Sequence, residues 1–139
     1  MKIIRQKKDL ISLISKINTI SFIPTMGCLH RGHELLIKKA KKKSKITLVS
    51  IFINPKQFNS KNDFKTYPRN FKKDAQILKY LKVDYLYYPK YEDIFSFKIK
   101  NKIYLHQFSK KLCGKHRPGH FKGVLEVVNR FLEILSPKY

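Results

Sequence analysis

The sequence of 139 residues contains no tryptophan, only two cysteines and only nine acidic residues. Cys28 and Cys113 lie far apart and in no CxxC pattern, so they predict neither a disulfide framework nor a zinc knuckle. The longest apolar run, ITLVSIFI at 46–53, is too short to span a bilayer, and the N-terminal segment lacks the continuous apolar core of a signal peptide. We therefore expect one soluble, cytoplasmic domain in a reducing compartment, with no membrane partner.

The nine acidic residues contrast with 31 lysines and arginines, which gives a formal net charge of +22. Such a charge is typical of proteins that bind nucleic acid or an anionic membrane. However, 26 of the basic residues are lysines, they are scattered along the chain, and other residues with A/T-rich codons are also abundant. A biased genome composition explains this pattern more simply than a nucleic-acid groove, so we expect no specific nucleic-acid partner. The overall field would still favour an anionic ligand such as ATP.

Apolar residues follow helical and strand periods in alternation along the chain. Helical spacing is found at 7–17, 33–40, 70–81 and 121–135, and buried strands are predicted at 19–25, 46–53 and 83–89. Strands that alternate with helices indicate a parallel sheet of right-handed βαβ units. We therefore expect an α/β fold, with a Rossmann-like parallel sheet and flanking helices. A further strand is predicted at 102–108, KIYLHQF.

The segment PTMGCLHRGHELLI, residues 24–37, places two histidines and two glycines where a predicted strand passes into a helix. Ligands of open α/β sheets bind at the carboxyl ends of strands, where the N–H groups and dipole of the next helix attract phosphate. Gly27 would let a ligand approach the backbone, and Gly32 would allow a tight entry into the helix. His30 and His33, three residues apart, would project from one side and stabilise or protonate a reacting phosphate.

Two other interpretations use the same histidine pair. A His-x-x-His pair can bind zinc, but no aspartate or third histidine lies nearby in the sequence, so we expect no metal site. The pair can also be two polar residues that cap a helix. The short pattern HxGH does not decide between a cap and a phosphate site. The longer string around it favours function.

That string resembles the PTMGxLHxGHxxLI signature of the pantothenate synthetase (pantoate–β-alanine ligase) family, within the HIGH-motif nucleotidylyltransferase superfamily. Three more segments resemble the family in order and at nearly its spacing: SIFINPKQF at 50–58, YPR at 67–69 and KLCGKHRPGHFKGV at 111–124. One HIGH-like motif identifies only the superfamily, whereas four ordered motifs point to this family. The resemblance covers nearly the whole chain and implies the nucleotide-binding domain of the superfamily.

The resemblance implies an ATP-dependent ligation in two steps, with Mg²⁺ accompanying the nucleotide. The carboxylate of pantoate attacks the α-phosphorus of ATP to give pantoyl adenylate and pyrophosphate, and the amine of β-alanine then displaces AMP. The family implies that His33 is the catalytic proton donor and His30 its partner at the phosphates. Gln57 is implied to hold pantoate near the β-alanine site, and an amide does offer a donor and an acceptor to a hydroxy acid. The implied ATP-binding residues are Met26, Gly27, Cys28, Leu29, His30, Arg31, Gly32 and His33.

Five other matched residues have two interpretations each. Tyr67 and Arg69 either reach a substrate anion or form a turn. Asp74 lies where the family has an acidic residue near magnesium, yet on a lysine-rich helix it is equally a surface charge. Arg117 and His120 either bind an anion or belong to a structural loop that caps the last helix.

By resemblance, residues 1–139 are the N-terminal half of such a protein and an incomplete nucleotide-binding domain. The family's Gly-Glu-Lys-Asp segment, Ser-Ser-Arg loop and C-terminal lid domain have no counterpart here. At least one strand of the sheet is also expected to be missing, which would leave a sheet edge uncovered. The family suggests a homodimer, and a complementing C-terminal fragment is another expected partner. The alternatives are a non-catalytic relic of the ligase and a basic nucleic-acid-binding module, and we expect the chain alone to be a poor or inactive enzyme.

Overall fold

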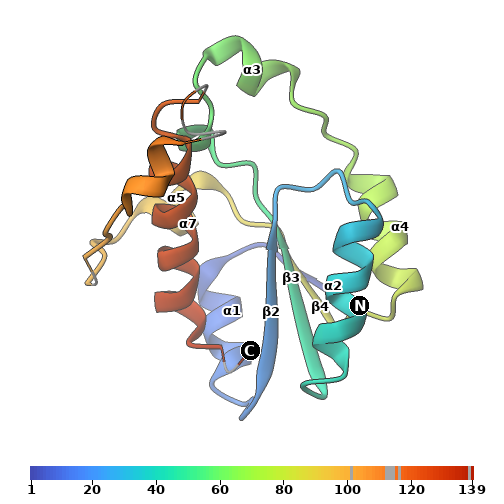
Figure 1. Ribbon diagram of the computed structural model, residues 1–139. Coiled ribbons are helices and arrows are strands. Elements are labelled where there is room, and N and C mark those ends of the chain that lie inside the picture. Colours follow the sequence, from blue (N-terminus) through green and yellow to red (C-terminus); the bar gives the residue numbers. More distant parts are fainter. Residues whose placement is uncertain (101, 112–114, 116, 138) are drawn as a thin grey trace.

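The computed structural model of the chain describes residues 1–100, 102–111, 115, 117–137 and 139. Cys113 and parts of the motif at 111–124 therefore lie outside the described residues. A four-stranded parallel sheet occupies the centre, in the order β1-β4-β3-β2 (Figure 1). The strands are β1 Lys2–Ile4, β2 Ile20–Thr25, β3 Ile46–Ile51 and β4 Tyr85–Tyr87. The predicted α/β fold is confirmed, and β1 is a strand that the sequence patterns did not predict.

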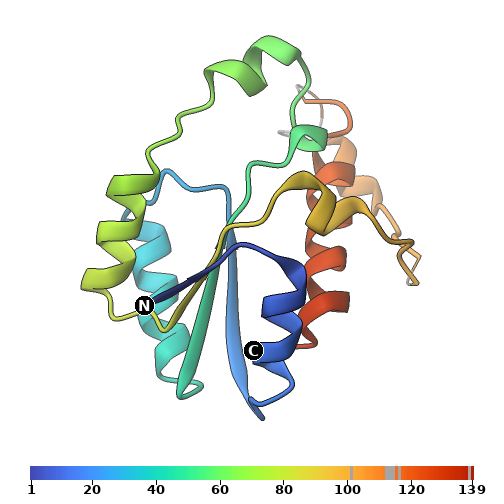
Figure 2. The same cartoon turned by 180° about the vertical axis from the view of Figure 1, so that it is seen from behind.

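Helices cover both faces of this sheet, as the two opposite views show (Figure 1 and Figure 2). One face is covered by α1 (Lys7–Ile14), α5 (Tyr91–Phe95) and α7 (His120–Leu135). The other face is covered by α2 (Arg31–Lys41) and α4 (Phe71–Tyr80). A short helix, α3 (Lys61–Thr66), lies beyond the carboxyl ends of the strands, and the 3-10 turns are η1 (Pro55–Gln57) and η2 (Gln107–Lys110).

Successive strand residues bury their side chains on opposite faces of the sheet. Leu48 and Tyr87 pack with Phe131 on the α1 and α7 side. Val49 and Leu86, which are register partners, pack on the α2 and α4 side. Burial of each such side chain contributes about 1.5–3 kcal/mol. Because both faces are covered, β3 is a continuous apolar run, which explains why it was easy to predict.

The predicted strand at 102–108 is wrong. Residues 102–106 form no regular secondary structure, and the chain then enters the 3-10 turn η2. Tyr104 is 80% exposed and Leu105 46% exposed, so these two side chains cover no core. A strand also needs a neighbour to accept its hydrogen bonds, and no described strand pairs with this segment.

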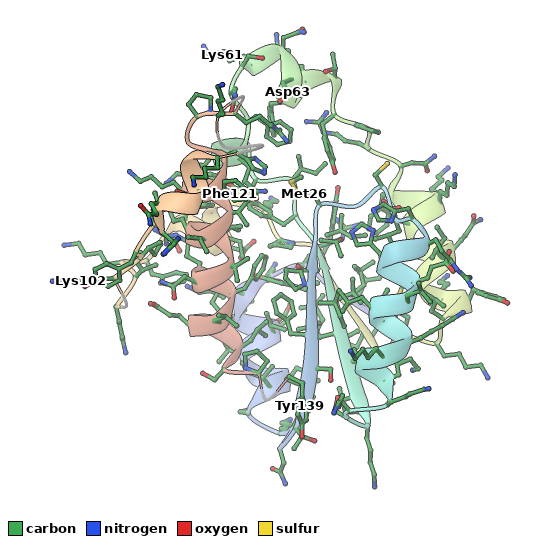
Figure 3. The ribbon with its side chains drawn as sticks, viewed as in Figure 1. Met26, Lys61, Asp63, Lys102, Phe121 and Tyr139 are labelled. Atoms are coloured by element: carbon green, nitrogen blue, oxygen red, sulfur yellow. The ribbon has the colours of Figure 1, made fainter. Side chains whose placement is uncertain are left out.

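The outer edge of β2 is partly covered by the end of the described chain. The N–H of Phe22 donates to the carbonyl of Tyr139 at 2.9 Å, and the N–H of Tyr139 donates to the carbonyl of Ile20 at 3.4 Å. This is the bonding pattern of a parallel pair of strands. Figure 3 shows Tyr139 beside the amino end of β2.

Candidate active site

The loop between β2 and α2 lies at the carboxyl edge of the sheet, where Figure 3 labels Met26. Gly27 and Cys28 both have left-handed backbones, with φ of 79° and 55°. Cys28 is therefore an uncommon non-glycine residue at positive φ, and its thiol is free and exposed. Two successive left-handed residues turn the chain sharply out of the strand and into the helix.

Asp74, on the first turn of α4, ties this loop to the neighbouring helix. Its Oδ2 accepts the N–H of Cys28 at 2.9 Å, and its Oδ1 accepts the N–H of Leu29 at 2.8 Å. The residue is only 3% exposed, so Asp74 is not the surface charge that its lysine-rich surroundings allowed. A Cβ added to Gly27 would lie 2.9 Å from Oδ2 of Asp74, which explains a glycine at that position.

The two histidines form a reciprocal cap at the start of α2. His30 is the N-cap residue, and its Nδ1 accepts the N–H of Gly32 at 3.1 Å. Nδ1 of His33 in turn accepts the N–H of His30 at 3.4 Å. The ring centroids are 4.1 Å apart. The capping interpretation is thus confirmed, and because each Nδ1 is an acceptor, the bonds assign the proton of each neutral ring to Nε2.

Most N–H groups that were expected to attract phosphate are already bonded within the protein. The N–H of Gly27 donates to Oγ1 of Thr25 at 3.1 Å. Those of Cys28 and Leu29 are held by Asp74, and those of His30 and Gly32 are held by the histidine pair. An anion at this edge would therefore depend largely on the imidazole Nε2–H donors.

The electrostatic surroundings favour neutral His33. Burial lowers the pKa of His33 below its usual 6.5, the neighbouring His30 lowers it further, and Asp74 opposes both effects. The ring is therefore an uncharged donor at neutral pH. Burial also raises the pKa of the Tyr67 hydroxyl above its usual 10, with smaller contributions from Cys28 and Asp74, so this hydroxyl stays protonated.

A cavity of about 440 Å³ opens between the carboxyl ends of β2 and β3 and the helix α7. It brings together His33, Gln57 and the backbone of Met26 and Gly27, and it adds Tyr67, whose role the sequence had left open. Its lining residues are Pro24, Thr25, Met26, Gly27, His33, Phe52, Gln57, Tyr67, Val124, Val127, Val128 and Phe131.

Other residues of the predicted ATP segment do not line this cavity. His30 lies behind His33 as the helix cap, and Leu29 is buried in the core between the sheet and α2. The exposed Arg31 forms an ion pair with Glu34 at 3.4 Å. A larger cavity of about 800 Å³ lies at the far ends of α2 and α4, but its polar lining consists of lysines and Tyr80 and carries no imidazole, amide or carboxylate.

Gln57 is held by contacts that the sequence patterns did not predict. Its Oε1 accepts from Nδ2 of the fully buried Asn54 at 3.0 Å, and the same Nδ2 donates to the carbonyl of Gly123 at 3.0 Å. The NH₂ of Gln57 is therefore the group left to donate. Nδ1 of His120 lies 2.8 Å from the carbonyl oxygen of Gln57 and holds the same turn.

Gly123 lets α7 pack directly on the turn η1. A Cβ at this position would overlap the carbonyl group of Lys56. The two elements are therefore in backbone contact, which only glycine permits. The NPKQF string was a signal for Gln57, but nothing local in the sequence marks Gly123 as its support.

The remaining residues with two interpretations have structural partners. Arg69 donates to the carbonyls of Phe64 and Lys65 at 2.6 and 2.9 Å, and so caps the end of α3. Arg117 pairs with Asp63 at 3.4 Å. These contacts favour the turn and loop interpretations over direct anion binding.

Within the described ranges no group of three or more His, Cys, Asp or Glu side chains lies close enough to hold a metal ion. None of the helices described there combines the length and the apolar character needed to span a bilayer.

Sequence comparison gives matches along the whole chain. Residues 2–139 match the family model described as pantoate-beta-alanine ligase. The pantothenate synthetase of Pseudothermotoga lettingae is 42% identical over 137 residues, which is 99% of this chain and 49% of the relative. That of Francisella tularensis subsp. novicida is 44% identical over 138 residues, which is 96% of this chain and 52% of the relative. The chain thus spans about half the length of the curated relatives it matches.

Solved structures give the same result. The crystal structure of pantoate-beta-alanine ligase from Francisella tularensis, complexed with beta-gamma ATP and beta-alanine, matches with a TM-score of 0.90 and 43% identity. The match covers 99% of this chain and 54% of that chain. Pantothenate synthetase from Thermus thermophilus matches with a TM-score of 0.88 and 31% identity, over 99% of this chain and 50% of that one. The resemblance stated from four motifs is therefore confirmed.

Proposed function

The chain belongs to the pantoate–β-alanine ligase family, and from this premise we propose that it supplies the ATP and pantoate sites of an enzyme that joins pantoate to β-alanine. The observation that carries the proposal is the 440 Å³ cavity in which His33 and Gln57 meet at the carboxyl edge of the sheet. A relative of this fold is described as complexed with beta-gamma ATP and beta-alanine. ATP is therefore the proposed nucleotide, bound along Met26–His33.

In the first step the carboxylate oxygen of pantoate forms a bond to the α-phosphorus of ATP. The bond from this phosphorus to the bridging oxygen breaks, and its electron pair leaves with pyrophosphate. Negative charge therefore grows on the phosphate oxygens, and fixed hydrogen-bond donors stabilise it. We propose that Nε2–H of His33 is such a donor and that His30 is its partner, since both rings are locked by their Nδ1 bonds.

Gln57 and α7 are the proposed pantoate site. Pantoate is a small hydroxy acid with a branched, apolar middle, and it needs polar contacts at its ends and an apolar wall beside them. The NH₂ of Gln57, which has no hydrogen-bond partner among the described residues, is a donor for the oxygen atoms of pantoate. Val127 and Phe131 of α7, with Phe52, supply the apolar wall.

In the second step the amine of β-alanine attacks the carbonyl carbon of pantoyl adenylate. The new C–N bond replaces the C–O bond to AMP, which leaves with the electron pair, and the attacking nitrogen loses a proton to solvent. We propose that Mg²⁺ enters on the phosphates of ATP, because both oxygens of the buried Asp74 already accept backbone N–H groups. From the composition we also propose a cytoplasmic setting, and from the family a homodimer.

The chain spans about half the length of its curated relatives. We propose that turnover also uses groups outside residues 1–139, because stabilising a departing pyrophosphate needs donors from several directions. We propose no specific nucleic-acid partner, because the basic residues are mostly lysines scattered along the chain.

Pantoate-dependent exchange of pyrophosphate into ATP tests the function. The chain is assayed alone and with the separately expressed C-terminal half of the Francisella tularensis enzyme. We expect weak or no exchange alone and clear exchange with the added half. Absence of exchange in both, together with no ATP binding in calorimetry, would refute the proposal. Strong exchange by the chain alone would refute the need for a second half.

A further inference from the structure

Asp74 is the only buried acidic residue in the described part of the chain. It lies on α4, 46 residues from Cys28, yet its two oxygens accept two successive backbone N–H groups of the nucleotide loop. Successive amides that converge after left-handed residues form a concavity suited to an anion. In this protein the anion in that concavity is the carboxylate of Asp74.

We propose that Asp74 is the positioning residue of the nucleotide loop. By filling the concavity at Cys28 and Leu29, its carboxylate holds the left-handed turn and keeps phosphate away from these two amides. The phosphates of ATP are thereby directed to the ring donor of His33. The inference rests on the proposed function, because it assigns the way in which ATP is oriented.

The geometry of Gly27 supports this assignment independently. Its added Cβ would lie 2.9 Å from Oδ2 of Asp74 and 3.2 Å from Cγ2 of Ile51. A side chain at position 27 therefore has no room between the carboxylate and Ile51 at the end of β3. Gly27 and His33 line the same cavity, so the contact with Asp74 lies next to the proposed donor.

A role as a magnesium ligand is the alternative for Asp74, and it makes a different prediction. A metal ligand would affect ATP binding only when Mg²⁺ is present. A positioning residue would affect the binding of ATP equally with Mg²⁺ and with EDTA, because the loop geometry does not depend on the metal.

The test compares Asp74→Asn with a matched control, Asp84→Asn. Like Asp74, Asp84 accepts two hydrogen bonds from a segment distant in sequence. Its Oδ2 accepts the N–H and the hydroxyl of Thr47, in β3, at 2.8 and 2.9 Å. It lies at the amino ends of β3 and β4, away from the site. Both changes remove a carboxylate charge that accepts two hydrogen bonds, so both are expected to reduce stability. Only in Asp74→Asn must an NH₂ oppose a backbone donor, because each oxygen of Asp74 accepts one N–H.

The measurements are ATP affinity by calorimetry and hydrogen exchange of single amides by NMR, on the chain alone and with the complementing half. We expect Asp74→Asn to weaken ATP binding about tenfold with Mg²⁺ and with EDTA, and to speed exchange at Cys28 and Leu29, as for loss of a charge-assisted bond. Asp84→Asn should change ATP affinity by less than about twofold.

The results distinguish a positioning role of Asp74 from a metal-binding role and from a purely structural role. Equal ATP affinity of the parent and Asp74→Asn, or an effect seen only with Mg²⁺, would overturn the positioning role while leaving the proposed function intact. A parent chain that binds no ATP in either setting would overturn the proposed function and the nucleotide-positioning role together. An equal effect of Asp84→Asn would reduce Asp74 to a structural residue and also overturn the inference.

Discussion

The two walls of the cavity are built in different ways. The loop wall, residues 26–33, is held mainly by bonds between residues two or three apart, such as the cap of His33 on His30. The Gln57 wall is held by α7, through Gly123 and His120, which lie more than sixty residues away in the sequence. The first wall therefore needs only its own segment and one tie to Asp74, whereas the second exists only when α7 is docked.

This difference predicts that a substitution can disrupt one wall of the cavity and leave the other wall intact. A change at the contact between α7 and η1 should remove the Gln57 wall and leave the loop wall able to bind ATP. A change in the loop should have the opposite effect. Substitutions in each wall, with controls, test this separation.

Gly123→Ala is expected to have the largest effect. The new methyl group would overlap the carbonyl of Lys56, so α7 must move away from η1. We expect a loss of about 3 kcal/mol in the free energy of unfolding, as for overpacking against a rigid neighbour. Urea unfolding measures this, and pantoate binding should be lost while exchange at the Cys28 amide stays slow.

Gly119→Ala is the matched control for that change. Gly119 is also left-handed, with φ of 81°, but a Cβ there would meet no atom within 4 Å. We expect only the strain of a left-handed alanine, about 1 kcal/mol. Similar losses in the two variants would show that Gly123 is not the contact that holds the second wall.

His33→Ala is expected to act on the loop wall. It removes the Nε2–H donor, and we expect adenylation in the complemented enzyme to slow by about a hundredfold, equivalent to about 2.7 kcal/mol. Pyrophosphate exchange measures the rate. Leu36→Ala, an exposed position on the same helix, is the control. Unchanged exchange in His33→Ala would remove this residue from the mechanism.

Gln57→Ala should weaken pantoate binding about tenfold with little change in ATP affinity, as for loss of one hydrogen bond to an anion. Gln57→Glu sharpens the test. A glutamate can still accept from Asn54, but it presents an oxygen where the NH₂ of Gln57 had donated. We expect it to bind pantoate more weakly than the alanine variant does. Tighter binding by the glutamate variant would show that the amide is oriented the other way.

The smallest expected effect is a shift in the titration of His33. In the parent, the pKa of His33 should lie below 6.5 in an NMR titration, because burial and His30 lower it. His30→Asn keeps a capping side chain, removes the neighbouring ring and should raise this pKa. Asp74→Asn should lower it further. Shifts in the opposite directions would contradict the electrostatic account of this wall.

The same lowered pKa has a consequence for stability. Between the folded pKa and 6.5 the unfolded chain binds a proton at His33 that the folded chain does not bind, so this contribution to stability is complete above pH 6.5. It decreases as the pH falls from 6.5 toward the folded pKa. The free energy of unfolding, measured at pH 7 and at pH 5.5, should therefore fall more in the parent than in His33→Gln.

Local sequence patterns predicted those parts of the site that are formed by residues close together in the sequence. The histidine pair, Gly27 and Gln57 stand in contiguous strings, and the strands around them are apolar runs that only a buried parallel sheet explains. The same reasoning failed at 102–108, because an apolar period predicts a strand whether or not a neighbour exists to pair with it. It also missed α3 and α5, which are too short to show a helical period.

The sequence by itself therefore determined the alternation of strands and helices, the family, and the placing of His30, His33 and Gln57 at strand ends. Only the tertiary structure decided that Asp74 is buried against the loop and that Gly123 seats α7 on η1. The physical reason is the separation in sequence between the residues that interact. Periodicity and caps act within about four residues, whereas the bond from Asp74 to Cys28 spans 46 residues and that from Asn54 to Gly123 spans 69. Such contacts exist only after the helices have packed on the sheet.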